Sequence, residues 1–210
     1  MTLSAILSFA AVVGLLTLTP GMDTALILRT AALGEPRRAW GVVAGIQTGT
    51  LIWGALTSAG VTALLTASHL AYEILRWAGV CYLTWMGLTM LWSTFRGRGA
   101  AADLPVEKAG NTFLPGWRRG TLTNLLNPKV GVFYVALLPQ FIPAGAPVFA
   151  AGLLLTSIHI GLGTAWSAVL VLLARRLRRA MQRPRARRLL DRITGTVIAG
   201  FGVRLALSDR

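Results

Sequence analysis

The sequence predicts an all-α membrane protein that crosses the bilayer several times. The chain is 54% hydrophobic and 13% charged, whereas a soluble domain has about 25% charged residues. Its charges are clustered and leave long uncharged windows, each near or above the roughly 20 residues that a spanning helix needs. A soluble helical bundle is disfavoured, because soluble helices keep a polar face. The uncharged windows are residues 2–22, 39–68, 77–95 and 130–174.

We expect a single membrane transport domain, residues 1–210, with six transmembrane helices. The last uncharged window is too long for one helix and contains Pro139, Pro143 and Pro147. Residues 140–147 are typical of a turn, so one span ends before them and another follows. The sixth span is short and either begins inside the preceding basic loop or thins the bilayer locally. The predicted spans are residues 4–28, 40–65, 75–95, 120–141, 148–174 and 193–207.

The fourth span has to begin before its uncharged window. Residues 130–141 are too few to cross a bilayer, so the span recruits residues back to about 120. This extension places Asn124, Asn127 and Lys129 inside the membrane region.

Basic residues alternate between successive loops. They follow the first and third spans, and nine arginines lie in the loop of residues 175–192 after the fifth. The loop after the second span holds one arginine offset by one glutamate, and the turn after the fourth span is uncharged. By the positive-inside rule, both termini then face outward. Anionic lipid headgroups beside a cytoplasmic loop account for the net charge of +14, so membrane lipid rather than nucleic acid is the expected partner.

Proline interrupts an apolar segment beside a formal charge in each half of the chain. Proline removes a backbone donor and clashes with the preceding turn. In lipid, the freed groups must find partners in protein or in a water-filled cavity. Broken first and fourth helices favour two inverted three-helix repeats with a translocation site between them. The interruptions are Thr19-Pro20-Gly21-Met22-Asp23 and Asn127-Pro128-Lys129.

Asp23 and Lys129 are the charged candidates for this site. A charge at membrane depth costs several kcal/mol and usually marks a pathway or a partner. Asp23 could instead cap the helix that restarts after Gly21, and that helix N-terminus is also a natural anion site. Lys129 could snorkel to the headgroups, pair with Asp23 across the breaks, or contact a substrate carboxylate.

Five polar side chains within the spans are further candidates. Asn124 and Asn127 either satisfy backbone groups near Pro128 or coordinate a substrate, and the sequence does not decide between these roles. Gln47 and Thr48 lie on a helix whose glycines recur every fourth residue, a pattern that favours close helix packing; the two side chains are possible cavity-lining residues. His159 lies within the fifth span, where an interhelical hydrogen bond to a carbonyl is favoured over a proton relay.

Enzyme and metal signatures are absent from the sequence. No His, Cys, Asp or Glu cluster has metal-ligand spacing, and the single cysteine, Cys81, cannot form an intramolecular disulfide. Ser157 and His159 are the nearest pair to a nucleophile and base, but residues two apart on a helix point to different faces. We therefore expect a transporter that is not an enzyme and binds no metal or cofactor.

The segment from Asn124 to Tyr134, continuing to Leu138-Pro139-Gln140-Phe141, resembles the hallmark of the lysine exporter (LysE/RhtB) family of amino-acid exporters, on its RhtB-like branch. Thr19 to Asp23 resembles its Pro-Gly-Pro motif, except that Met22 replaces the second proline. Residues 78–87 look like the family's third span and residues 198–207 like its C-terminus.

The resemblance implies export of amino acids or close derivatives across the bacterial inner membrane, driven by the proton gradient. One acid and one base in the expected cavity favour a neutral substrate such as threonine, homoserine or leucine. Alternatives are an exporter of another small solute or cation, or a passive channel. The oligomeric state, including a homo-oligomer, stays open. The functional positions carried over are Pro20, Gly21, Asp23, Asn127, Pro128 and Lys129.

Overall fold

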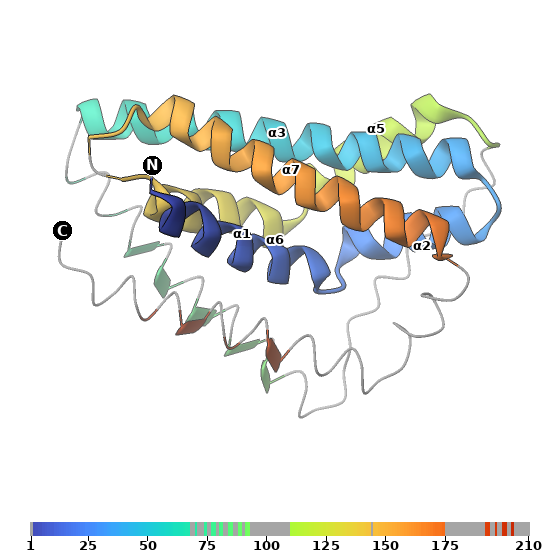
Figure 1. Cartoon of the computed structure of the whole chain (residues 1–210), viewed down its shortest axis with the longest axis horizontal. Helices are drawn as coiled ribbons and strands as arrows, with labels where there is room; N and C mark the ends of the chain where they lie inside the picture. The colour runs from blue at the N-terminus through green and yellow to red at the C-terminus, as the bar shows by residue number, and fades with distance from the viewer. Residues whose placement is uncertain are drawn as a thin grey trace.

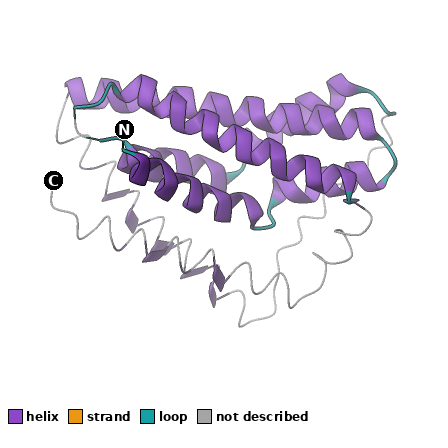
Figure 2. Cartoon of the chain, viewed as in Figure 1, coloured by secondary structure: helices purple, strands orange, loops and turns teal. Residues whose placement is uncertain are grey.

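The computed structural model describes residues 2–67, 110–143 and 145–174, together with scattered positions between 70 and 92 and between 192 and 203. This described part contains helices and loops and no strand (Figure 2). The all-α prediction is confirmed. The predicted third span (75–95), sixth span (193–207) and basic loop (175–192) lie largely outside the described residues.

The predicted first span is a broken helix. It consists of α1 (Leu3–Leu18) and α2 (Met22–Ala32), which are bent by 54°. Thr19 and Gly21 have extended backbones and separate the two pieces, so residues 19–21 form the first break. The break is sharp even though Met22 stands where the family motif has a second proline.

The second and fifth predicted spans are continuous helices. α3 (Pro36–Ala67) has 32 residues and α7 (Val148–Leu172) has 25. Both are long and apolar enough to cross a membrane, and the bent pair of α1 and α2 would add a third span among the described residues. Asn111 caps α3 from a distance, because its Oδ1 accepts hydrogen bonds from the backbone N–H groups of Arg37 (2.9 Å) and Arg38 (3.3 Å).

The predicted fourth span is also broken, as expected. α5 (Phe113–Leu125) starts earlier than the predicted residue 120. After the second break, residues 126–127, come α6 (Pro128–Val132), the π-helix η1 (Phe133–Leu137) and the 3-10 helix η2 (Leu138–Phe141). The predicted turn follows, with Gly145 at φ +80° before α7 begins.

The two broken helices run antiparallel (Figure 1). α2 packs on α5, and α1 packs on η2 at the other end of the bundle. The first piece of each broken helix thus packs on a later piece of the other, which agrees with inverted halves. The third helix of each proposed repeat lies largely outside the described residues, so the repeat itself stays a prediction.

Glycines allow α3 and α5 to approach closely. A Cβ atom on Gly41 or Gly45 would overlap the carbonyl oxygen of Phe113 or Trp117 on α5. From the other side, a Cβ atom on Gly120 would overlap the carbonyl oxygen of Val42. The packing role predicted for the glycine stripe is therefore confirmed at Gly41 and Gly45.

Apolar side chains form two separate clusters along the bundle. The first cluster joins α1 to η1, η2 and the start of α7, and includes Phe9, Phe133 and Leu155. The second joins α2 to the start of α3 and the end of α7, and includes Ile27 and Leu170. Both helix breaks lie between these clusters, which leaves a polar layer across the middle.

Candidate functional site

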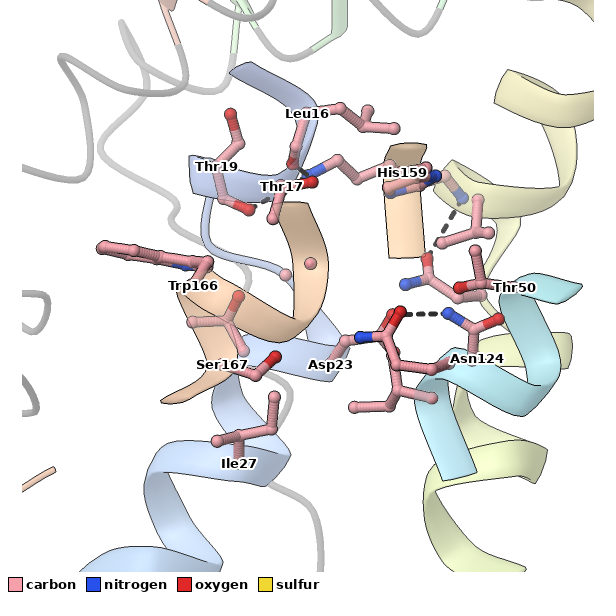
Figure 3. A pocket seen from close by; sticks show the side chains of 18 of the residues that line it. Leu16, Thr17, Thr19, Asp23, Ile27, Thr50, Asn124, His159, Trp166 and Ser167 are labelled. Carbon is pink, nitrogen blue, oxygen red and sulfur yellow. Dashed lines mark hydrogen bonds between the residues drawn. The ribbon is translucent and has the colours of Figure 1, made fainter. Parts of the chain in front are cut away.

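A small cavity with both polar and apolar walls lies between the two helix breaks (Figure 3). Its volume is about 70 Å³, which is room for a few water molecules rather than for a drug-sized ligand. Side chains from both halves of the chain line it. Its polar lining residues include Thr24, Asp23, Gln47, Thr50, Asn124, Asn127, Lys129, His159 and Ser167.

The cavity is near the middle of the long helix α3. Thr50 lines the cavity and is 14 residues from Pro36, the first residue of α3, which corresponds to about 21 Å at 1.5 Å per residue. The arginines at positions 37 and 38 mark the near end of that helix. The cavity is therefore remote from both ends of the span, as a translocation site requires.

Asp23 brings a carboxylate into this layer from the first turn of α2. Its Oδ2 accepts a hydrogen bond from Asn124 Nδ2 at 2.9 Å, across the two halves of the chain (Figure 3). Its Oδ1 is buried and makes no hydrogen bond of normal geometry, although the Asn127 side chain lies near the carboxylate. The helix dipole favours an acid at this position, so the capping and site roles considered for Asp23 are compatible.

Gly49 provides the space in which the Asn124 side chain lies. Asn124 is 1% exposed, and a Cβ atom on Gly49 would come within 2.6 Å of its Oδ1. The amide therefore presents its oxygen to α3 and its nitrogen to Asp23. Gly49 thus positions Asn124 in addition to packing the helices.

Lys129 binds the end of α1. Its ammonium donates hydrogen bonds to the carbonyl oxygens of Leu16 (2.7 Å) and Thr19 (3.0 Å). The structure shows an ion pair between Arg38 and Glu35 but none between Lys129 and Asp23, although these two charges are close enough to interact electrostatically.

Asn127 and the prolines shape the breaks. Asn127 Oδ1 accepts a hydrogen bond from the backbone N–H of Lys129 at 3.1 Å and so caps α6. Asn127 also lines the cavity, as does Gly21. Pro20 and Pro128 do not line it; Pro128 occupies the first position of α6, where a missing N–H costs no helical hydrogen bond.

Gln47 and His159 line the cavity, as predicted, but Thr48 does not. Thr48 Oγ1 accepts a hydrogen bond from Trp117 Nε1 at 3.1 Å and donates to the Ala44 carbonyl at 2.9 Å. It therefore contacts α5 and does not line this cavity, although it lines a second, more open hollow together with Gln47.

His159 makes an interhelical hydrogen bond, but its partner is a side-chain hydroxyl and not the carbonyl that was expected. Its Nδ1 lies 2.9 Å from the hydroxyl of Tyr134 on η1. The two rings are stacked, with centroids 5.8 Å apart and planes 15° apart. His159 thus connects the cavity to the interior of the first apolar cluster.

Several lining residues were not predicted from the sequence. Gly163, Trp166, Ser167 and Leu170 on α7 lie four, seven, eight and eleven residues after His159. This spacing is one face of a helix, so helical periodicity from His159 was the signal that would have found them. Thr24 and Thr50 carry no comparable signal.

Comparison with known proteins agrees with this architecture. The sequence model of a family described as LysE type translocator matches residues 4–209. A homoserine/homoserine lactone efflux protein of Salmonella typhimurium is 33% identical over 91% of this chain and 91% of its own length. A threonine efflux protein of Escherichia coli is 27% identical over 91% of this chain and 92% of its own.

A further relative, an uncharacterized membrane protein of Bacillus subtilis, is 24% identical over 97% of this chain and 99% of its own length. No solved structure matches the chain. The family match spans both helix breaks and nearly the whole sequence. The chain therefore belongs to the LysE type translocator family, and it is a polytopic α-helical membrane protein.

Proposed function

We propose that this protein exports neutral amino acids or close derivatives from the bacterial cytoplasm across the inner membrane. Three kinds of support converge on this function. The chain belongs to a translocator family. Relatives that align with 90% or more of this chain are named for efflux of homoserine, threonine and leucine. The cavity of this chain lies between two helix breaks, the arrangement typical of secondary transporters.

The observation that carries the proposal is that the buried Oδ1 of Asp23 makes no hydrogen bond of normal geometry. A buried acceptor without a donor costs about 1–3 kcal/mol. A substrate ammonium group or a proton would relieve this cost by supplying the donor. If the two compete for one carboxylate, each excludes the other, which is the requirement for exchanging a substrate against a proton.

The charge around the cavity favours a substrate without net charge. Asp23 is acidic and Lys129 is basic, and both line the cavity. A zwitterion leaves this balance unchanged, whereas a cationic substrate adds a charge at membrane depth. The other cavity-lining groups, amides, hydroxyls and one imidazole, suit hydrogen bonding to a small polar molecule.

The basic end of the bundle is assigned to the cytoplasm. Arg29, Arg37 and Arg38 surround the connection from α2 to α3, and α7 leads toward the arginine-rich residues 175–192. The positive-inside rule then places both termini outside. A reporter that is active only outside the cytoplasm, fused after Arg210, should be active; a silent reporter would reverse the orientation.

Transport by purified protein tests the function. Proteoliposomes are given a panel of amino acids under an imposed pH gradient. We expect accumulation of a neutral amino acid above equilibrium, and at least a 100-fold lower rate for Asp23→Asn. Glu35→Gln, which neutralises a carboxylate in the loop before α3, is the control and should stay within about twofold of wild type.

The same experiment separates the alternatives. Substrate flow that never exceeds equilibrium would indicate a passive channel. Transport of metal or other inorganic cations, with none of any amino acid, would indicate a different exporter. Full activity in Asp23→Asn would remove Asp23 from the mechanism.

A further inference from the structure

The second hollow lies between α3, the start of α5 and α7. Its volume is about 520 Å³, several times the 70 Å³ of the central cavity. Both α5 and α7 pack on α3, which runs along the edge of the bundle away from α1 (Figure 1). The hollow is therefore a peripheral feature that transport through the central cavity does not use. Its apolar walls are formed by Trp40, Val43, Ala44, Leu51, Phe113 and Ile160.

The hollow opens toward the hydrocarbon of the membrane. Trp40, Leu51 and Phe113 line it and are exposed, and α3 is long and apolar enough to span a bilayer. Exposed apolar side chains along such a span contact lipid rather than water. Walls without an occupant would lose their dispersion contacts, so we expect a flexible apolar chain to fill the space.

The length of the hollow matches one leaflet of the bilayer. Along α3 it extends from Trp40 to Leu51, eleven residues, which corresponds to about 16 Å at 1.5 Å per residue. The hydrocarbon of one leaflet is about 15 Å thick, half of the whole core. Trp40 lies only four residues after Pro36, the start of α3, which is the depth of an interfacial aromatic residue. The hollow therefore suits a single acyl chain that enters from the basic end of the bundle.

Arg37 supplies a positive charge at the shallow end of the hollow. Its side chain is exposed, and the neighbouring carboxylate of Glu35 is paired with Arg38. A guanidinium group binds phosphate with two parallel hydrogen bonds. Residues spaced by three or four share one face of a helix, and this spacing joins Arg37, Trp40, Ala44, Thr48 and Leu51.

The polar side chains of α3 beside the hollow are directed elsewhere. The amide of Gln47 lies against Gly163, where a Cβ atom would come within 3.1 Å of its Nε2, and both residues line the central cavity. The Thr48 hydroxyl donates to the Ala44 carbonyl at 2.9 Å. This arrangement leaves the hollow to an apolar occupant. A chain in it packs behind Gln47, a residue of the transport cavity.

We propose that the second hollow binds one acyl chain of an anionic phospholipid from the leaflet at the basic end, with the lipid phosphate on Arg37. Three features specify this ligand. The apolar walls select a hydrocarbon chain, their length selects a single leaflet, and Arg37 selects an anionic headgroup. The site is separate from the central cavity and does not rest on the proposed function.

Thermal unfolding of the delipidated protein in detergent micelles tests the headgroup contact. Phosphatidylglycerol at ten times its Kd should raise the melting temperature by about 3–6 °C. Phosphatidylcholine, which has the same chains and no net charge, should bind about fivefold more weakly. Arg37→Gln should weaken the binding of phosphatidylglycerol about fivefold as well. Without added lipid, this variant should unfold at the wild-type temperature.

Arg118→Gln is the matched control for the charge. Arg118 is an exposed arginine of α5, at the same end of the bundle. Gly116 and Gly120, two residues before and after it, pack on α3, so Arg118 lies on the opposite face of its helix. We expect Arg118→Gln to bind phosphatidylglycerol as tightly as wild type does.

A variant that fills the hollow tests the chain contact. Native mass spectrometry counts the phosphatidylglycerol molecules that stay bound, and Ala44→Trp should retain one fewer than wild type. Leu162→Trp is the control, because Leu162 is exposed on α7 and does not line the hollow. If Ala44→Trp does not fold, the comparison of Arg37→Gln with Arg118→Gln still decides.

Three results would overturn the site. Equal affinity for the two lipids, or wild-type affinity in Arg37→Gln, would remove the headgroup contact. The same number of bound lipids in folded Ala44→Trp and wild type would remove the chain. A dimer in micelles that Ala44→Trp dissociates would show that a second copy of the chain covers the hollow. None of these measurements uses transport, so amino-acid export and the lipid site stand or fall separately.

Discussion

The two helix breaks complete their hydrogen bonds in different ways. The second break has a local side-chain cap, because Asn127 accepts from the N–H of Lys129. At the first break, Gly21 offers no side-chain cap. Two carbonyl oxygens at the end of α1 are instead bound by the side chain of Lys129, more than 100 residues away.

This difference makes the first break depend on the second. Lys129 caps α1 with its side chain while its own backbone is capped by Asn127. Any motion that separates α1 from α6 must break the two hydrogen bonds of the ammonium group. The contacts between the halves at the cavity are thus polar and few, whereas the apolar clusters on either side are extensive.

Removing the ammonium group of Lys129 should have the largest effect on the two helix breaks. Lys129→Met leaves two carbonyls at the first break without their donor, and we expect the free energy of unfolding to fall by about 2–4 kcal/mol. Amino-acid efflux should be abolished as well. Thermal unfolding in detergent micelles measures the loss of stability. Arg37→Met is the control, because the Arg37 side chain is exposed. Equal melting temperatures for the two variants would contradict the dependence of one break on the other.

Removing the local cap of the second break should have a smaller effect. Asn127→Ala deletes the N-cap of α6, and such caps contribute about 1 kcal/mol. The same unfolding measurement applies, and Asn127→Ser, which restores a capping oxygen, should recover most of the loss. A loss as large as that of Lys129→Met would mean that the second break is not stabilised locally.

Adding a second proline at the first break should have the smallest effect. Met22 is the first residue of α2, and Gly21 before it is extended, with φ −142° and ψ −165°. Both conformations suit a proline at position 22. We expect Met22→Pro to be tolerated, with a gain of up to about 1 kcal/mol from the less flexible unfolded chain. Leu26→Pro, inside the helix, is the contrasting variant and should lose about 3 kcal/mol or more.

The sequence determined the positions of two long helices, the two breaks and the polar residues beside them. Apolar windows defined α3 and α7, and the prolines defined both breaks, because these features depend on local chemistry and on the need to satisfy backbone groups in lipid. Asp23, Asn124, Asn127 and Lys129 were predicted to lie at one site, and the structure brings them to one cavity.

Only the tertiary structure decided which partner each polar group takes. The sequence allowed Lys129 to pair with Asp23, a lipid headgroup or a substrate. In the structure its ammonium lies beside the end of α1 and binds two carbonyl oxygens there. Thr48 faces Trp117 because the close approach at Gly41 and Gly45 fixes the rotation of α3 about its axis. Tyr134 reaches His159 from the π-helix η1, whose register no sequence pattern revealed. Side-chain direction depends on helix rotation and packing, and these are set by contacts distant in the chain.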